Sequence, residues 1–420
     1  MASDDTGTAS LPSLRDLTIS QAGEGLRTGK FTSVDLVKAY IKRIEETKQL
    51  MIVIHMDEDA LEVAQMLDKE RAEKGSRRAN LDDDAGYRVE YPEFILRDYI
   101  NYSRFLTPSG PGTLPGCSKG SAVATAIGLS VAALGTANAN AGVKESGAIA
   151  NAADFNLVGF KPTTRSMMKS GYFRFSPQGT PTIGILAKTV KDTVDIMAGI
   201  YEQYEHNEWS SRIPSDQAPE WDEIYEGSLL LVFDSDPYPQ VMESFEAALK
   251  TLALSGATVV ENANDQGTSE LKKLKAQVKS LVQSSEFKED VFKCLTRRGN
   301  DSNNPENAQR VYYLVRRCPN EEPTERELNK MLWTRTTRIA ANKEEYTKVL
   351  EKALIISKNQ GIWATIKKHR LDMFVIPSSD EGVTLELAAQ ENAPVMSVPL
   401  VFFPDGFQRK YTYEITPKIP

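Results

Sequence analysis

The sequence predicts a globular protein of the α/β class on three observations. Apolar residues recur at helical spacing in several segments, short apolar runs typical of buried strands occur in others, and the two kinds alternate along most of the chain. At 228–264 an apolar run, a helical segment and a second apolar run form a β-α-β unit, which favours parallel pairing of the two strands. The 420 residues suffice for one large domain or two medium ones.

The N-terminal part predicts two helices. The first begins at Thr32, a good N-cap, and its apolar side chains recur at helical spacing from Val34 to Ile44. The second has Asp57 or Asp59 as its N-cap and ends at Gly75. We therefore expect the fold to open with two helices.

The centre of the chain predicts buried strands and an apolar helix. Residues 94–96 form a short apolar strand, and the Gly, Pro and Ser of 107–121 predict a loop. Residues 121–135 are almost entirely apolar and predict a helix that runs into a buried strand. Residues 157–164 (LVGFKPTT) predict a second buried strand followed by a turn.

The C-terminal half predicts further helices and two returning strands. Residues 188–200 read as an amphipathic helix, 201–226 as a polar linker, and 268–370 as mostly helical with solvated charges. Two more buried strands are expected at 371–379 and 393–400. The apolar face of the 188–200 helix comprises Val190, Val194 and Met197.

Composition excludes several kinds of partner. The net charge of −8 is spread along the chain, so neither nucleic acid nor a membrane surface is expected as a partner. The three histidines and three cysteines lack metal-ligand spacing, so no metal, cofactor or disulfide framework is expected. The N-terminus has no signal-peptide pattern, and no apolar run reaches the ~18 residues of a membrane span. We expect a cytoplasmic protein with a small-molecule ligand or substrate.

Motifs in a fixed order then give a family resemblance. They are GCSKGSAVATAIGLSVAALGT, NLVGFKPTTR, TPTIGILAKTVKDTVDIMAGI and VMSVPLVFFPDG, preceded by the helical segment 11–46. Together they resemble the amidase signature hydrolases, in particular their fungal-type members. The resemblance implies one α/β/α domain with a mixed, twisted sheet between helical layers, shortened near the site and at the C-terminus.

The same resemblance divides this single domain, 1–420, into parts. Residues 1–80 supply N-terminal helices, and 90–200 form the signature core. Residues 201–226 are linker-like, and 227–420 supply peripheral helices and the returning core strands.

Active members of this family resemble a serine hydrolase with an unusual triad: a lysine in an ILVKDN-like strand end, a relay serine in a GSSSGSA loop, and a nucleophilic serine in GTDTGGSI. A neutral, partly buried lysine can accept a proton that the relay serine passes on, which activates the nucleophile. In this chain FILRDYIN puts Arg97 at the lysine position, and GCSKGSA puts Cys117 at the relay position. Arginine stays protonated in proteins, so the base is lost.

The nucleophile position depends on the direction of counting. Counting forward from Cys117 by the family spacing reaches Ala141, whereas counting back from NLVGFKP reaches Gly147, next to Ser146. The two counts disagree because the intervening segment is several residues longer than its family counterpart. Either the nucleophile is gone or it has moved to Ser146. The resemblance assigns ligand binding to Ser118, Gly120, Thr136, Asn138 and Asn140.

Three functions remain open. The first is an amidase-like protein, a pseudoenzyme that has lost amide hydrolysis but keeps a small-molecule cleft, in a secondary-metabolite pathway. The second is a remodelled amide or ester hydrolase that uses Cys117 or Ser146, with Lys119 or Lys144 as replacement base. The third is a vestigial or misassigned gene product.

Overall fold

The fold is given by a computed structural model of the chain. Residues described by the structure are 11–50, 52–53, 56–75, 95–96, 104–107, 110–113, 118–137, 147–163, 182–200, 229–232, 239–260, 270, 274, 343–377 and 393–401.

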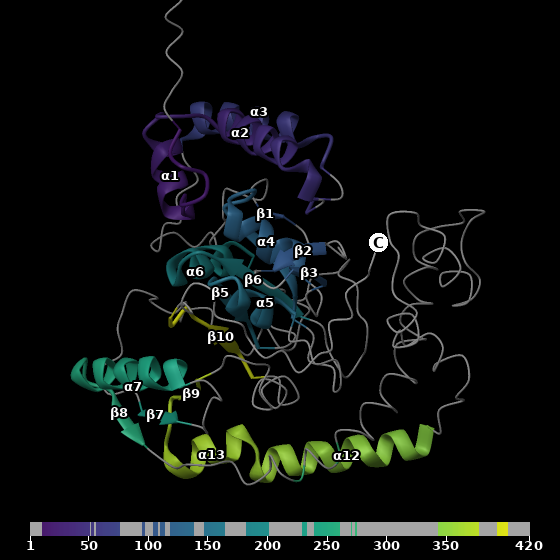
Figure 1. Cartoon of the computed structure of the whole chain (residues 1–420), viewed down its shortest axis with the longest axis vertical. Coiled ribbons are helices and arrows are strands. Elements are labelled where there is room, and N and C mark those ends of the chain that lie inside the picture. The colour runs from purple at the N-terminus through teal and green to yellow at the C-terminus, as the bar shows by residue number, and fades with distance from the viewer. Residues whose placement is uncertain are drawn as a thin grey trace, which may run out of the picture.

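A five-stranded mixed sheet forms the centre of the molecule (Figure 1). In its order β1-β4-β6-β5-β10, β1 pairs with β4 in parallel and the other neighbours are antiparallel. Because β4 and β5 both run antiparallel to β6, their carboxyl ends lie at the same edge of the sheet. The strands are β1 (Ile95–Leu96), β4 (Ala132–Ala137), β5 (Val158–Lys161), β6 (Thr182–Ala187) and β10 (Val395–Ser397).

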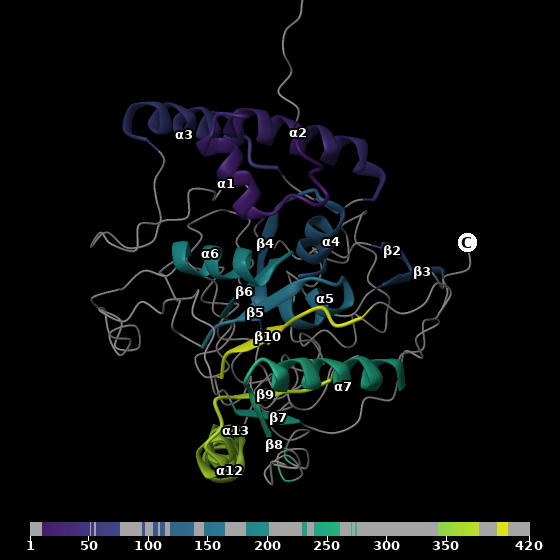
Figure 2. The same cartoon turned by 90° about the vertical axis from the view of Figure 1, so that its left-hand side faces the viewer.

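Helices cover both faces of this sheet. Figure 2 shows β4, β6 and β5 between α6 on one side and α4 and α5 on the other. Ile185 and Phe160 pack on the first face with residues of α1, α2 and α6, and Leu186 packs on the second with Ala122 and Ala148. The helices are α1 (Ile19–Arg27), α2 (Ser33–Glu46), α3 (Ala60–Lys74), α4 (Lys119–Ile127), α5 (Ala148–Asp154) and α6 (Val190–Ile200).

A three-stranded parallel sheet lies beyond β10, at the opposite end of the molecule from α1, α2 and α3 (Figure 1 and Figure 2). Its order is β8-β7-β9. The remaining elements are η1 (Lys48–Leu50), β2 (Arg104–Thr107), β3 (Gly110–Thr113), β7 (Leu229–Val232), α7 (Pro239–Leu254), β8 (Thr258–Val260), α12 (Lys343–Gln360), α13 (Ile362–His369) and β9 (Met373–Val375).

Two buried polar side chains hold the start of α1 against the core. Asp192 Oδ1 accepts hydrogen bonds from the backbone N–H groups of Ile19 (3.0 Å) and Ser20 (3.4 Å). Lys188 Nζ donates to the carbonyl oxygens of Leu14 (3.2 Å) and Leu17 (2.9 Å). Burial raises the pKa of the Asp192 carboxyl, and burial lowers the pKa of Lys188 to about 8 against the opposing effect of the Asp192 charge.

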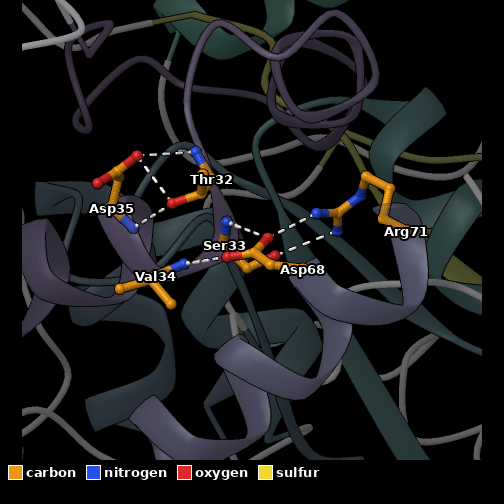
Figure 3. Close-up of polar contacts among 6 residues, drawn as sticks. All are labelled: Thr32, Ser33, Val34, Asp35, Asp68 and Arg71. Atoms are coloured by element: carbon orange, nitrogen blue, oxygen red, sulfur yellow. Dashed lines mark hydrogen bonds and ion pairs between the residues drawn. The ribbon is translucent and has the colours of Figure 1, made fainter. Parts of the chain in front are cut away.

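A carboxylate of α3 caps the first turn of α2 (Figure 3). Asp68 accepts hydrogen bonds from the backbone N–H groups of Ser33 (2.8 Å) and Val34 (3.1 Å). Arg71 Nη1 lies 2.6 Å from Asp68 Oδ1. Burial acts to raise the pKa of Asp68, but these hydrogen bonds together outweigh it, so the pKa is lowered. The two helices are therefore joined by a charged cap that favours the ionised carboxylate.

The structure confirms most of the predicted elements. The helix expected from Thr32 is α2, and Thr32 forms a capping box with Asp35. The helix expected to end at Gly75 is α3, with Asp59 at its N-cap position but no side-chain cap bond. The β-α-β unit is β7, α7 and β8, and its strands pair in parallel.

Some expectations are wrong in detail. Part of the expected loop at 107–121 belongs to a hairpin, in which Thr107 pairs with Gly110. The helix at 188–200 is α6, but Val190 is 46% exposed. Its buried face includes Asp192 and Thr193, because Asp192 binds the N-terminus of α1.

The returning strands are also less buried than expected. Met373 of β9 and Met396 of β10 are 47% and 39% exposed. Both strands lie at the edges of their sheets, where one side has no neighbouring strand. Two elements were not expected at all: α1 and β6. None of the helices in the described part of the chain is long and apolar enough to cross a membrane.

Candidate functional site

The carboxyl ends of β4 and β5 meet the N-terminal ends of two helices at one edge of the central sheet. α4 is followed by a short connection and then β4, and it packs back along that strand. α5 likewise precedes β5 and packs on it. The residues Ser118, Gly135, Gly147, Lys161 and Gly184 define this candidate site.

Ser118 is the N-cap residue of α4 and is almost fully buried (2% exposed). Its backbone is left-handed, with φ 65° and ψ 18°, a conformation that costs a residue other than glycine about 1 kcal/mol. Its side chain lies against Gly135 of β4: a Cβ atom at position 135 would stand 2.6 Å from Ser118 Oγ. Only a glycine at 135 leaves room for Ser118 in this position.

Gly147 is the N-cap residue of α5. Its φ of 49° and ψ of −112° suit glycine, and its carbonyl oxygen accepts a hydrogen bond from the buried Asn151 amide (2.8 Å). The helix lies directly on β5, because a Cβ atom at Gly159 would stand 2.6 Å from Ala152 Cβ. Ser397 of β10 donates to the carbonyl oxygen of a residue in the first turn of α5 (3.2 Å). The start of α5 is thus fixed over β5 and β10.

Three residues form a row across the sheet below these helix ends. Gly135 of β4 pairs with Gly184 of β6. Phe160 of β5 pairs with Ile185, so continuing that register by one residue places Lys161 level with Gly184. Gly135, Gly184 and Lys161 therefore lie side by side, and two of the three have no side chain. We call this row the floor of the site.

Lys161 is the one charged residue of the floor. It is 3% exposed, and its Nζ donates to the carbonyl oxygen of Pro162 (3.2 Å). Burial alone lowers the pKa of Lys161 to about 8. Within the described residues it forms no ion pair, so its positive charge has no counter-ion there.

The structure places part of the predicted site. Ser118 and Gly120 lie together at the start of α4, both buried, and Thr136 lies in β4, where its backbone pairs with Ile183. The remaining candidates lie outside the described residues and stay predictions: Arg97, Cys117, Asn138, Asn140, Ala141 and Ser146.

Of the two nucleophile counts, the structure describes only the one that leads to Gly147. This residue directly precedes α5 and has no side chain that could attack a substrate. Lys161 was not predicted as a site residue. The signal for it was a lysine that closes the apolar run LVGF, where a strand was already expected.

A mixed sheet between helical layers, with a glycine-rich edge beneath two helix ends, defines an α/β/α protein of the hydrolase type. Residues 107–403 match the family model for amidases, and the chain belongs to the amidase family. It is 22% identical over 507 aligned residues to a protein of the fungus Arthroderma benhamiae that is itself predicted to be an amidase; the alignment covers 99% of this chain and 82% of that protein. One of the proteins that make up the glutamyl-tRNA(Gln) amidotransferase of Helicobacter hepaticus is 29% identical over 169 residues, which are 39% of this chain and 36% of that protein.

Solved structures support the same fold. An amidase family protein from Bacillus anthracis superposes with a TM-score of 0.68 at 18% identity, covering 92% of this chain and 84% of that one. The native peptide amidase from Stenotrophomonas maltophilia gives 0.68 at 20% identity, covering 92% and 90%. These neighbours confirm the fold class expected from the motifs.

Proposed function

We propose that this amidase-family chain binds a small, mostly apolar molecule at the candidate site and does not hydrolyse it. The observation that carries the proposal is Gly147, which stands at the start of α5 where one count places the nucleophile and has no reactive side chain. The other count leads to Ala141, which has no hydroxyl group either.

The chemistry of the base supports the same conclusion. The guanidinium of Arg97 does not lose its proton at physiological pH, so it accepts none from a relay residue. A thiol at Cys117 then has no group to which it can pass a proton. Because loss of one triad member already costs several orders of magnitude in rate, three changes together leave no efficient route to amide hydrolysis.

The surviving parts support binding. Glycines at two of the three floor positions leave the sheet surface bare beneath the starts of α4 and α5. Carboxyl ends of strands beside helix N-termini are common ligand sites in α/β proteins. We place the ligand among small metabolites, with secondary metabolism as the setting that the resemblance suggests, and the protein in the cytoplasm.

A remodelled hydrolase is the second candidate. Ser146 directly precedes Gly147 at the start of α5, so a moved nucleophile would belong at this position. Cys117 is the other candidate, and a cation within about 4 to 6 Å would lower its thiol pKa and raise its reactivity.

Covalent labelling separates the two functions. The purified protein is treated with a fluorophosphonate, which modifies activated serines, and separately with a brief pulse of iodoacetamide, followed by mass spectrometry. The proposal predicts no fluorophosphonate adduct. An adduct at Ser146, absent from the heat-denatured protein, would support a relocated nucleophile instead. Iodoacetamide labelling of Cys117 ahead of Cys294 and Cys318, together with turnover lost in Cys117→Ala, would support a thiol enzyme.

A further inference from the structure

We propose that Lys161 binds the carboxylate group of the ligand, so that the molecule bound at the candidate site is a small carboxylic acid. The inference rests on the proposed function and names its ligand class. It is carried by the place of Lys161 in the floor and by the shortage of acceptors around its ammonium group.

The face of the sheet from which Lys161 projects follows from its neighbours. Gly159, two residues earlier in β5, faces α5, because a Cβ atom there would meet Ala152. Side chains two apart in a strand project from the same face. Gly135 faces α4, because a Cβ atom there would meet Ser118. Lys161 and Gly135 therefore share the face that carries both helix ends.

The floor leaves space beside Lys161. Neighbouring strands lie about 4.8 Å apart, so the backbones of Lys161 and Gly135 are separated by two such spacings, or about 10 Å. Gly184 lies between them and has no side chain to fill that distance. The four-carbon stem of a lysine is long enough to extend over Gly184 toward Ser118.

The charge of Lys161 calls for an acceptor. An ammonium group has three donors, and within the described residues only the carbonyl oxygen of Pro162 accepts from Lys161. A buried charge without a partner is costly, whereas a carboxylate would supply both the opposite charge and two acceptor oxygens. An uncharged amide or ester supplies acceptors without the charge. The ammonium group therefore favours an acid over the corresponding amide.

Lys188 is a matched control within the same chain. It too is largely shielded from water, and its pKa is lowered to about the same value. Its Nζ, however, already has two carbonyl acceptors in the segment before α1, on the other side of the sheet. A ligand at the candidate site should not depend on it.

The experiment compares acids with their own amides. Benzoate, phenylacetate and hexanoate are titrated against the full-length protein by thermal shift and calorimetry, beside benzamide, phenylacetamide and hexanamide. At least one acid is expected to bind about tenfold or more tightly than its amide. That preference should disappear in Lys161→Met and in Lys161→Gln and persist in Lys188→Met.

Three results would overturn the inference: equal binding of acids and amides by the wild-type protein, a preference for acids that survives in both Lys161 variants, or no binding of any acid. The comparison within the wild-type protein holds even if neither variant folds. Amides that bind without turnover would leave the proposed function standing while removing the role of Lys161. Turnover of the amides would remove the proposed function itself.

Discussion

Ser118 and Gly135 fit together across the joint between α4 and β4: the Ser118 side chain occupies the space where a side chain at 135 would begin. The left-handed backbone of Ser118 directs its side chain there. Gly135→Ala is expected to destabilise the protein by about 1 to 3 kcal/mol, because the new methyl group would overpack against Ser118 and the surrounding structure is closely packed. Urea denaturation measures the change.

A double-mutant cycle isolates the contact. Ser118→Gly removes both the obstructing side chain and the cost of its positive φ, so the double variant Ser118→Gly/Gly135→Ala should be more stable than Gly135→Ala alone. Additive effects of the two substitutions would mean that the two residues do not press on each other.

Asp68 should matter more than Asp35, although both carboxylates serve the N-terminus of α2 (Figure 3). Asp68→Ala removes two backbone caps and leaves the largely buried Arg71 without its partner, with an expected loss of about 2 to 3 kcal/mol. Asp35→Ala removes one side of a capping box, for which about 1 kcal/mol is expected. Equal losses on denaturation would contradict the buried-cap account.

The stability contributed by Asp68 should also depend on pH. Its pKa is lower in the folded than in the unfolded protein, so its contribution is complete above the unfolded value and is lost as the pH falls through the folded value. The difference in stability between wild type and Asp68→Asn should therefore shrink on acidification from pH 6 to pH 3. A constant difference would show that the charge of Asp68 contributes nothing.

Mild alkali should stabilise the protein through its two buried lysines. Lys161 and Lys188 have a pKa of about 8 in the folded protein against 10.5 for the free side chain, so the unfolded chain binds more protons between these values. Stability should then rise from pH 8 to 9.5, by on the order of 1 kcal/mol for each lysine. Lys161→Met should reduce the rise in the urea-unfolding free energy, and an unchanged pH profile would refute this.

Restoring triad residues by sequence alone should fail. Arg97→Lys, Cys117→Ser and Ala141→Ser combined are expected to give no amide turnover, because position 141 is six residues before Gly147, where α5 is about to begin. Gly147→Ser is also expected to fail, because the backbone there has φ 49° and ψ −112°. Turnover in either variant, measured with an aryl amide, would show that the site is better preserved than the proposal states.

Local patterns predicted much of the fold. Helical spacing and a capping threonine located α2, and apolar runs located β4 and β5, because these signals lie within a few neighbouring residues. The first helix, α1, was missed although Thr18 and Gln21 form a capping box. The buried face of α6 was misjudged because Asp192 is buried by a contact with Ile19, far away in the sequence.

The site shows the same limit. Motif spacing located Ser118 and Gly120 but could not choose between Ala141 and Gly147, since the length of the intervening segment is not set by local rules. The floor depends on register between β4, β6 and β5, which no single segment encodes. Lys161 therefore became a site residue only when the three strands were seen together.

Hydrolysis and binding measured on the same preparation test the central claim most directly. The protein is incubated with p-nitroacetanilide, p-nitrophenyl acetate and benzamide, products are followed by chromatography, and binding of the unreactive compounds is followed by calorimetry. The proposal predicts saturable binding of at least one small apolar acid or amide and product formation no faster than with heat-denatured protein. Turnover that disappears on denaturation, recurs in independent preparations and is lost in Ser146→Ala or Cys117→Ala would contradict it.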